Sequence, residues 1–110
     1  MTHGDGMGLY ILRDGQPVRA TSIAEWGEFQ LSGRPKLNEE VLPDVHVSTV
    51  WLGADHRLTP GGAPVLWETM VFGGPHDGHQ DRYTSAEDAA AGHQRIAAMV
   101  RGAGVDGGRP

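Results

Sequence analysis

The chain has 110 residues, contains no cysteine and carries a formal net charge of −5. This length suits one domain with a single modest core, and the missing cysteines exclude a disulfide framework, a thiolate nucleophile and a cysteine metal site. The lysines and arginines are scattered, so there is no basic stripe for nucleic acid, and no apolar run approaches the roughly 20 residues of a membrane span. We therefore expect one folded domain in the cytoplasm that binds neither nucleic acid nor a membrane.

The N-terminal part predicts flexible residues followed by a β-hairpin. Residues 1–7 are glycine-rich and polar, and we expect them to be frayed. The apolar run at 8–12 and the segment 16–20 flank Asp14 and Gly15, a pair that is typical of a tight hairpin turn. The second segment contains a proline, which favours a position at the edge of a sheet.

A helix is predicted after the hairpin. Ser22 and Glu25 have the spacing of a capping box, in which the serine accepts from the first turn and the glutamate reaches back. Gly33 provides a stop, so the helix is predicted over residues 23–32. The segment 36–42 that follows is compatible with either a strand or a loop.

Two β-rich runs, 45–52 and 65–72, form the predicted central pair of strands, joined by a glycine- and proline-rich loop over 53–64. Both runs carry apolar side chains on both faces, with Trp51 and Trp67 on the same one. Such two-sided apolarity predicts that the sheet is covered on both sides, by helices or by a second copy of the chain.

The C-terminal part predicts a short edge strand at 80–83 and then a long helix over Ser85–Arg101. A second capping box at 84–87 opens this helix, and residues 102–110 are predicted to be a flexible tail. Small and apolar residues recur along the helix at the spacing of one face, namely Ala86, Ala89, Ala90, His93, Ile96, Ala97 and Val100.

These elements predict an α+β fold in which residues 8–101 form a single domain. Its sheet is antiparallel and has four or five strands, and its two helices lie at about 23–32 and 85–101. There is neither an internal repeat nor a linker that would divide the chain.

Several short motifs lie between Asp44 and Val100, namely STVWLG at 48–53, DH at 55–56, ETMVFGG at 68–74, RY at 82–83 and GH at 92–93. Together they resemble a family of small uncharacterised proteins from bacteriophages, prophages and actinobacteria. The resemblance implies a phage or mobile-element origin and therefore a place of action in the host cytoplasm. His76 and His79 are not part of the pattern.

Glu68 and His93 are both placed where apolar neighbours predict burial. A carboxylate and an imidazole that face a core are costly unless they are paired. If the last helix packs on the face of Leu66, Met70 and Phe72, the two side chains meet. Such a pair would either line a small polar pocket or hold the helix against the sheet. In the third interpretation the two residues do not meet and lie separately at the margin of the core.

Asp55 and His56 lie in the long loop, where functional residues are common. In a catalytic interpretation His56 is a general base that Asp55 orients. In the alternative interpretation Asp55 stabilises the turn through its own backbone.

The segment 76–81 contains His76, Asp77, His79 and Asp81, a density of imidazole and carboxylate that suits zinc or manganese. No fixed helical or strand spacing of ligands accompanies it, so a solvated turn is the favoured interpretation. No phosphate-binding loop and no nucleophile elbow is present, and we predict neither a metal nor a cofactor.

The sequence favours a small phage-type binding protein without enzymatic activity, acting on a host protein or a small ligand, for instance in counter-defence. Two alternatives are a metal-dependent hydrolase built on His56, Glu68, His76, His79 and His93, and a virion-associated structural protein. A homodimer is predicted through whichever apolar face or edge the helices leave bare. The candidate ligand- or partner-binding residues are Trp51, Asp55, His56, Trp67, Glu68, Arg82, Tyr83 and His93.

Overall fold

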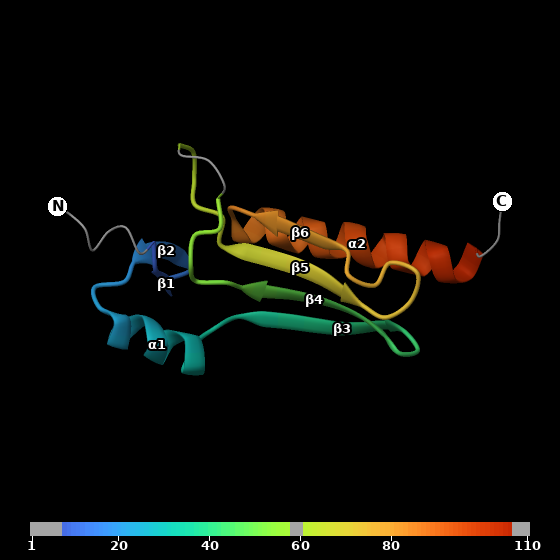
Figure 1. The fold of residues 1–110 in the computed structure, drawn as a ribbon, viewed down its shortest axis with the longest axis horizontal. Coiled ribbons are helices and arrows are strands. Elements are labelled where there is room, and N and C mark those ends of the chain that lie inside the picture. Colours follow the sequence, from blue (N-terminus) through green and yellow to red (C-terminus); the bar gives the residue numbers. More distant parts are fainter. Residues whose placement is uncertain (1–7, 58–60, 107–110) are drawn as a thin grey trace.

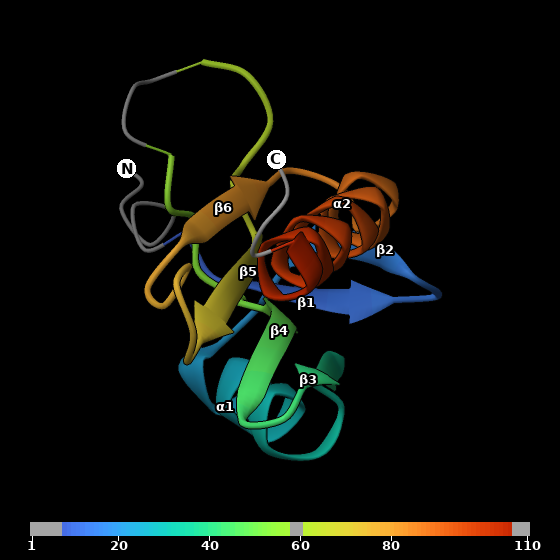
Figure 2. The same ribbon diagram turned by 90° about the vertical axis from the view of Figure 1, so that its right-hand side faces the viewer.

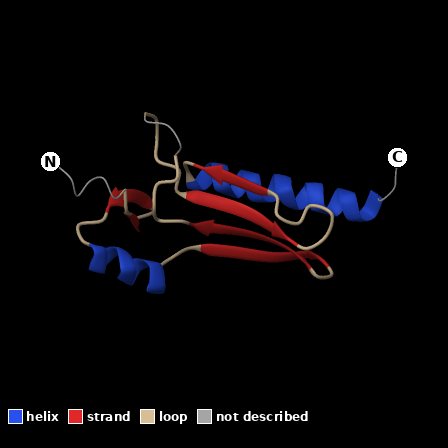
Figure 3. Ribbon diagram, viewed as in Figure 1, coloured by secondary structure: helices blue, strands red, loops and turns tan. Residues whose placement is uncertain are grey.

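The computed structural model describes residues 8–57 and 61–106, with only the backbone for 103–106. It shows one α+β domain with two helices, as predicted, and its strands form two antiparallel sheets, one of two and one of four strands (Figures 1 and 3). The predicted flexible ends at 1–7 and 107–110 lie outside the described residues. The elements are β1 (Tyr10–Arg13), β2 (Gln16–Arg19), α1 (Ile23–Ser32), β3 (Lys36–Leu42), β4 (Val45–Trp51), β5 (Trp67–Phe72), β6 (Gln80–Tyr83) and α2 (Ala86–Asp106).

The predicted hairpin is confirmed, and it forms a sheet of its own from β1 and β2. Asp14 and Gly15 form its turn with φ angles of 54° and 79°. Both angles lie in the left-handed region that a two-residue hairpin turn requires. The remaining strands form a meander in the order β3-β4-β5-β6, so the ambiguous segment at 36–42 is a strand.

Both helices begin at a serine cap. Ser22 Oγ accepts from the N–H of Glu25 at 3.0 Å, and α1 has the predicted bounds. The Glu25 carboxylate, however, accepts from the N–H of Thr21 at 2.7 Å instead of from Ser22. Ser85 Oγ accepts from the N–H of Asp88 at 3.0 Å, so the cap of α2 lies one residue later than the box predicted at 84–87.

The helix α2 is longer than predicted. Its backbone continues past Arg101 to Asp106, which corrects the tail predicted from Gly102. Glycine lowers helix stability by only about 1 kcal/mol per residue, so the glycines after Arg101 do not end the helix as a proline would. No helix in the described part of the chain is both long and apolar enough to cross a membrane.

The four-stranded sheet curves around α2, which lies along one of its faces (Figure 2). Side chains alternate between buried and half-buried along β4, and the buried set faces α2. The same alternation holds along β5 until Phe72. Small residues let α2 approach closely, since a Cβ at Gly92 would overlap the Tyr83 ring. The buried side chains of the two central strands are Val45, Val47, Thr49, Trp51, Trp67, Thr69 and Val71.

The opposite face of the sheet, here called the open face, is not covered by α2. It carries Val50, Met70 and Phe72, and the last is 49% exposed. The helix α1 does not cover this face either, because it packs at the end of the sheet, where Phe29 contacts Trp51 edge-to-face at 6.3 Å. Among the described residues, the predicted two-sided cover is therefore wrong for a single copy of the chain.

The core between α2 and the sheet consists of two apolar clusters. One contains Trp51, Trp67 and Tyr83, and the other contains Val47, Val71 and Ile96 with their buried neighbours. Thr49, Thr69 and His93 lie between these clusters along β4, β5 and α2. The core is thus interrupted by one polar layer.

Candidate functional site: the groove between β3 and α2

The polar layer is a continuous chain of hydrogen bonds from the core to the surface. Thr69 Oγ1 lies 2.6 Å from Thr49 Oγ1, which lies 2.7 Å from His93 Nδ1. His93 Nε2 lies 2.9 Å from Glu39 Oε1, and the other oxygen of Glu39 accepts from Arg101 at 2.9 Å. His93 is fully buried, whereas Glu39 and Arg101 are partly exposed, so the chain of bonds links the core to solvent.

One assignment of hydrogens satisfies every group in this layer. An ionised Glu39 can only accept, so Nε2 of His93 carries a hydrogen and donates it. In the neutral ring Nδ1 is then the acceptor for the Thr49 hydroxyl, whose oxygen accepts from Thr69. Pairing of this kind offsets the cost of removing these polar groups from water.

The predicted meeting of Glu68 and His93 is wrong, because the two residues lie on opposite faces of the sheet. α2 packs on the face of Thr49 and Thr69, whereas Glu68 points to the open face. There its carboxylate accepts from Arg82 Nε at 3.1 Å and from the Gln80 amide. A histidine–carboxylate contact does join α2 to the sheet, but it is made by Glu39, a residue that was not proposed for it, so both interpretations that paired Glu68 with His93 are wrong.

A groove of about 200 Å³ opens between the start of β3 and the first half of α2. Its most buried lining residues, which form the floor, are Thr49, Trp67, Ala89 and His93. Its rim is formed by Pro35, Lys36, Leu37, Ala86 and Ala90.

The walls of the groove are mainly apolar, and Leu37 on the rim is 50% exposed. The two polar groups of the floor already bond within the protein, so they do not attract a polar ligand strongly. An apolar concave site with a few oriented polar groups is the usual form of a binding pocket. The groove is therefore the best candidate site among the described residues.

Asp55 stabilises the loop after β4 and does not orient His56. Its carboxylate accepts from the N–H groups of Arg57 at 3.0 Å and Val65 at 2.9 Å, and from Arg57 Nε at 2.6 Å. Partial burial raises the pKa of Asp55, but these hydrogen bonds outweigh it and hold that pKa below its ordinary value. His56 Nδ1 instead donates to the carbonyl of Ala54 at 2.7 Å, so the turn-stabilising interpretation is confirmed.

The histidines of the β5–β6 connection are not assembled with the other proposed ligands. His79 Nε2 lies 3.6 Å from Asp81, and both side chains are more than a third exposed. Among the described residues, no three histidine, aspartate or glutamate side chains are grouped to hold a metal ion. His93 and Glu68 also lie on opposite faces of the sheet, so the five residues of the alternative hydrolase do not form one centre.

The aromatic candidates belong mostly to the core. Trp51 is fully buried and contacts Trp67 edge-to-face at 5.2 Å, so it offers no surface to a partner in this structure. Trp67 is 9% exposed and lines the groove. Burial raises the pKa of the Tyr83 hydroxyl, which lies near Thr69 but makes no hydrogen bond of standard geometry to any described residue.

Glu39 and Thr49, two central members of this site, were not among the residues proposed from the sequence. Thr49 could have been found from the sequence. It is paired with Thr69 on the neighbouring strand, and both lie on a face rich in valine and tryptophan. Two threonines at such positions indicate a buried polar pair. Glu39 could not be found in this way, because its segment was compatible with a loop.

The chain matches no family model, no curated protein and no solved structure. The class that the structure itself defines is a small single-domain α+β protein with one helix-covered antiparallel sheet.

Proposed function

We propose that this protein is a binding protein without enzymatic activity that takes an apolar group of its target into the groove between β3 and α2. The target is a host protein or a small ligand in the host cytoplasm, in keeping with the resemblance to phage proteins. The observation that carries this proposal is the apolar groove whose polar floor is already hydrogen-bonded within the protein. Such a site gains binding energy by removing apolar surface from water.

Filling the groove is expected to abolish this binding. Ala90 is exposed on α2 and lines the rim, so Ala90→Phe places a ring in the groove without displacing the core. Ala91→Phe is the matched control, because Ala91 is also exposed on α2 but does not line the groove. With N-acetyl-leucine amide as the probe, we expect NMR shift changes at groove residues in the wild type and in Ala91→Phe, and none in Ala90→Phe. Equal responses in all three proteins would rule out the groove as the site.

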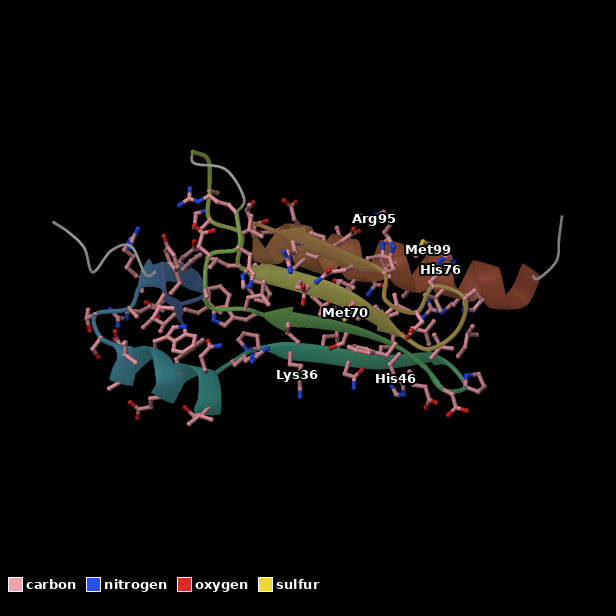
Figure 4. The ribbon with its side chains drawn as sticks, viewed as in Figure 1. Lys36, His46, Met70, His76, Arg95 and Met99 are labelled. Atoms are coloured by element: carbon pink, nitrogen blue, oxygen red, sulfur yellow. The ribbon has the colours of Figure 1, made fainter. Side chains whose placement is uncertain are left out.

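We further propose that a second copy of the chain covers the open face, as the predicted homodimer requires. The apolar centre at Val50, Met70 and Phe72 supports this, since Phe72 is 49% exposed in a single copy of the chain. Figure 4 shows Lys36 and His46 toward opposite ends of the β3–β4 pair, with Met70 on β5 between them.

Light scattering tests this assembly. We expect twice the chain mass of 11.8 kDa for the wild type and a single chain mass for Met70→Lys, because the new charge would be buried at the centre of the interface. The control is Gln94→Lys, which adds the same charge on the exposed side of α2 and is expected to remain dimeric. A wild-type protein that is monomeric at tens of micromolar would contradict the dimer, and larger assemblies would favour the structural alternative.

A further inference from the structure

The strand β3 is an edge of the four-stranded sheet, and its outer backbone groups follow from its register. Trp51 donates its N–H to the carbonyl of Pro35 at 3.2 Å, so this opposed pair is a hydrogen-bonded one. Hydrogen-bonded pairs recur every second residue of an antiparallel ladder, which makes Leu37 and Glu39 the next residues to bond inward to β4. The intervening residues therefore turn their N–H and carbonyl groups outward, and these are Lys36, Asn38 and Glu40.

The outward groups border the groove. Leu37, whose side chain lies on the α2 side of the sheet, is half exposed on the groove rim. A strand added beside β3 would place the residue opposite Leu37 on the same side, because side chains of paired residues share a face. That side chain would enter the groove next to Ala90.

We propose that the occupant of the groove is an extended peptide segment of the target, which adds to β3 as a further strand and inserts one aliphatic side chain beside Leu37. This inference rests on the proposed function of the groove and specifies the chemistry of the target. Main-chain hydrogen bonds to Lys36, Asn38 and Glu40 supply affinity, and the groove supplies selectivity.

The charges on β3 define the flanking residues of the peptide. Lys36 and Glu40 point to the open face at the two ends of the exposed edge. A complementary segment therefore carries an acidic residue opposite Lys36 and a basic residue opposite Glu40, with the aliphatic residue next to the acidic one. A β-bulge after Glu40 disrupts the regular edge, so strand addition is confined to Lys36–Glu40.

The polar layer favours an aliphatic side chain over a polar one. The Thr49 hydroxyl is already bonded to Nδ1 of His93, and the second nitrogen of His93 is bonded to Glu39. A polar side chain in the groove would lose its bonds to water without finding a free partner of equal strength. The same segment with aspartate in place of leucine is therefore expected to bind at least about tenfold more weakly.

The test uses two probes on the full chain, observed by NMR. The first is a capped seven-residue peptide of sequence Thr-Lys-Thr-Thr-Leu-Glu-Thr, which pairs antiparallel to β3, together with its reversed sequence for the parallel arrangement. The second is N-acetyl-leucine amide, which can fill the groove but cannot form a strand. We expect one of the two peptides to slow hydrogen exchange at the Asn38 amide, an effect that the small amide cannot produce.

Two variants separate strand addition from filling of the groove. Asn38→Pro removes the central outward N–H and leaves the ladder to β4 intact, since proline is tolerated where an edge N–H faces solvent. It is expected to weaken peptide binding about tenfold and to leave binding of N-acetyl-leucine amide unchanged. Asn38→Ala keeps the N–H and is expected to bind both probes as the wild type does.

Each outcome decides between the two proposals. Weaker peptide binding in both Asn38→Pro and Ala90→Phe supports strand addition at the groove. If Ala90→Phe abolishes binding of both probes but Asn38→Pro binds the peptide normally, the groove binds apolar groups and strand addition is wrong. If neither peptide causes shifts at millimolar concentration while the small amide does, strand addition is again wrong. If neither probe binds, the proposed function of the groove fails as well.

Discussion

Replacing Gly92 with alanine is expected to destabilise the fold by about 3 kcal/mol, although alanine is the better helix former. A Cβ at this position would overlap three atoms of Tyr83, including its hydroxyl oxygen. Tyr83 is buried between α2 and the sheet and is only 8% exposed, so the ring has little room to move. Urea denaturation of the wild type and the variant measures the loss as a lower transition midpoint at an unchanged slope.

Gly27 provides the matched control for this substitution. It is also a helical glycine, but a Cβ there would meet nothing within 4 Å. Gly27→Ala is therefore expected to stabilise the fold by about 1 kcal/mol through helix propensity alone. Tyr83→Leu removes the ring that the new Cβ would overlap. The double variant Gly92→Ala with Tyr83→Leu is therefore expected to lose less stability than the sum of the losses of the two single variants. A stabilising effect of Gly92→Ala like that of Gly27→Ala would contradict the close contact.

Replacing His93 with leucine is expected to cost about 1–3 kcal/mol, because it removes the hydrogen-bond partner of the Thr49 hydroxyl in a buried layer. Leucine fills most of the space, so the loss reflects the unpaired polar groups more than a cavity. Adding Thr49→Val and Thr69→Val removes those groups with little change of shape. We expect the triple variant to regain most of the stability, measured again by urea denaturation.

The partner of His93 can be identified by a double-mutant cycle. Glu39→Gln keeps the size of the side chain but loses its charge, and it is expected to couple with His93→Leu. Glu68→Leu is the control, because Glu68 lies on the other face of the sheet, and its effect should add to that of His93→Leu. Coupling of His93 with Glu68 instead of Glu39 would contradict the packing of α2 described above.

The bounds of α1 and the hairpin could be predicted from the sequence because their signals are local. Ser22 and Gly33 cap α1, and Asp14 with Gly15 favours one turn geometry, whatever the rest of the chain does. The strand over Lys36–Leu42 was ambiguous for the opposite reason. It is a polar edge strand, and its pairing with β4 depends on tertiary packing that no local signal encodes.

The candidate site could be predicted only in part. The helical spacing of His93 within an apolar stripe predicted its burial correctly. Its partners were not predictable, because β4 and β5 carry apolar residues on both faces and their alternation does not say which face α2 covers. Once α2 packed on the face of Thr49, the carboxylate within reach was Glu39 on β3 and not Glu68.

The sequence by itself determined the α+β class, the order of the elements and the burial of the apolar stripe on α2, since these follow from caps, turns and periodicity. Only the tertiary structure decided the groove, the polar layer and the open face, because each of them brings together residues from strands and a helix that are far apart in the chain. Such contacts depend on which face of the sheet the helix buries, and on that face Gly92 lets α2 pack closely against Tyr83.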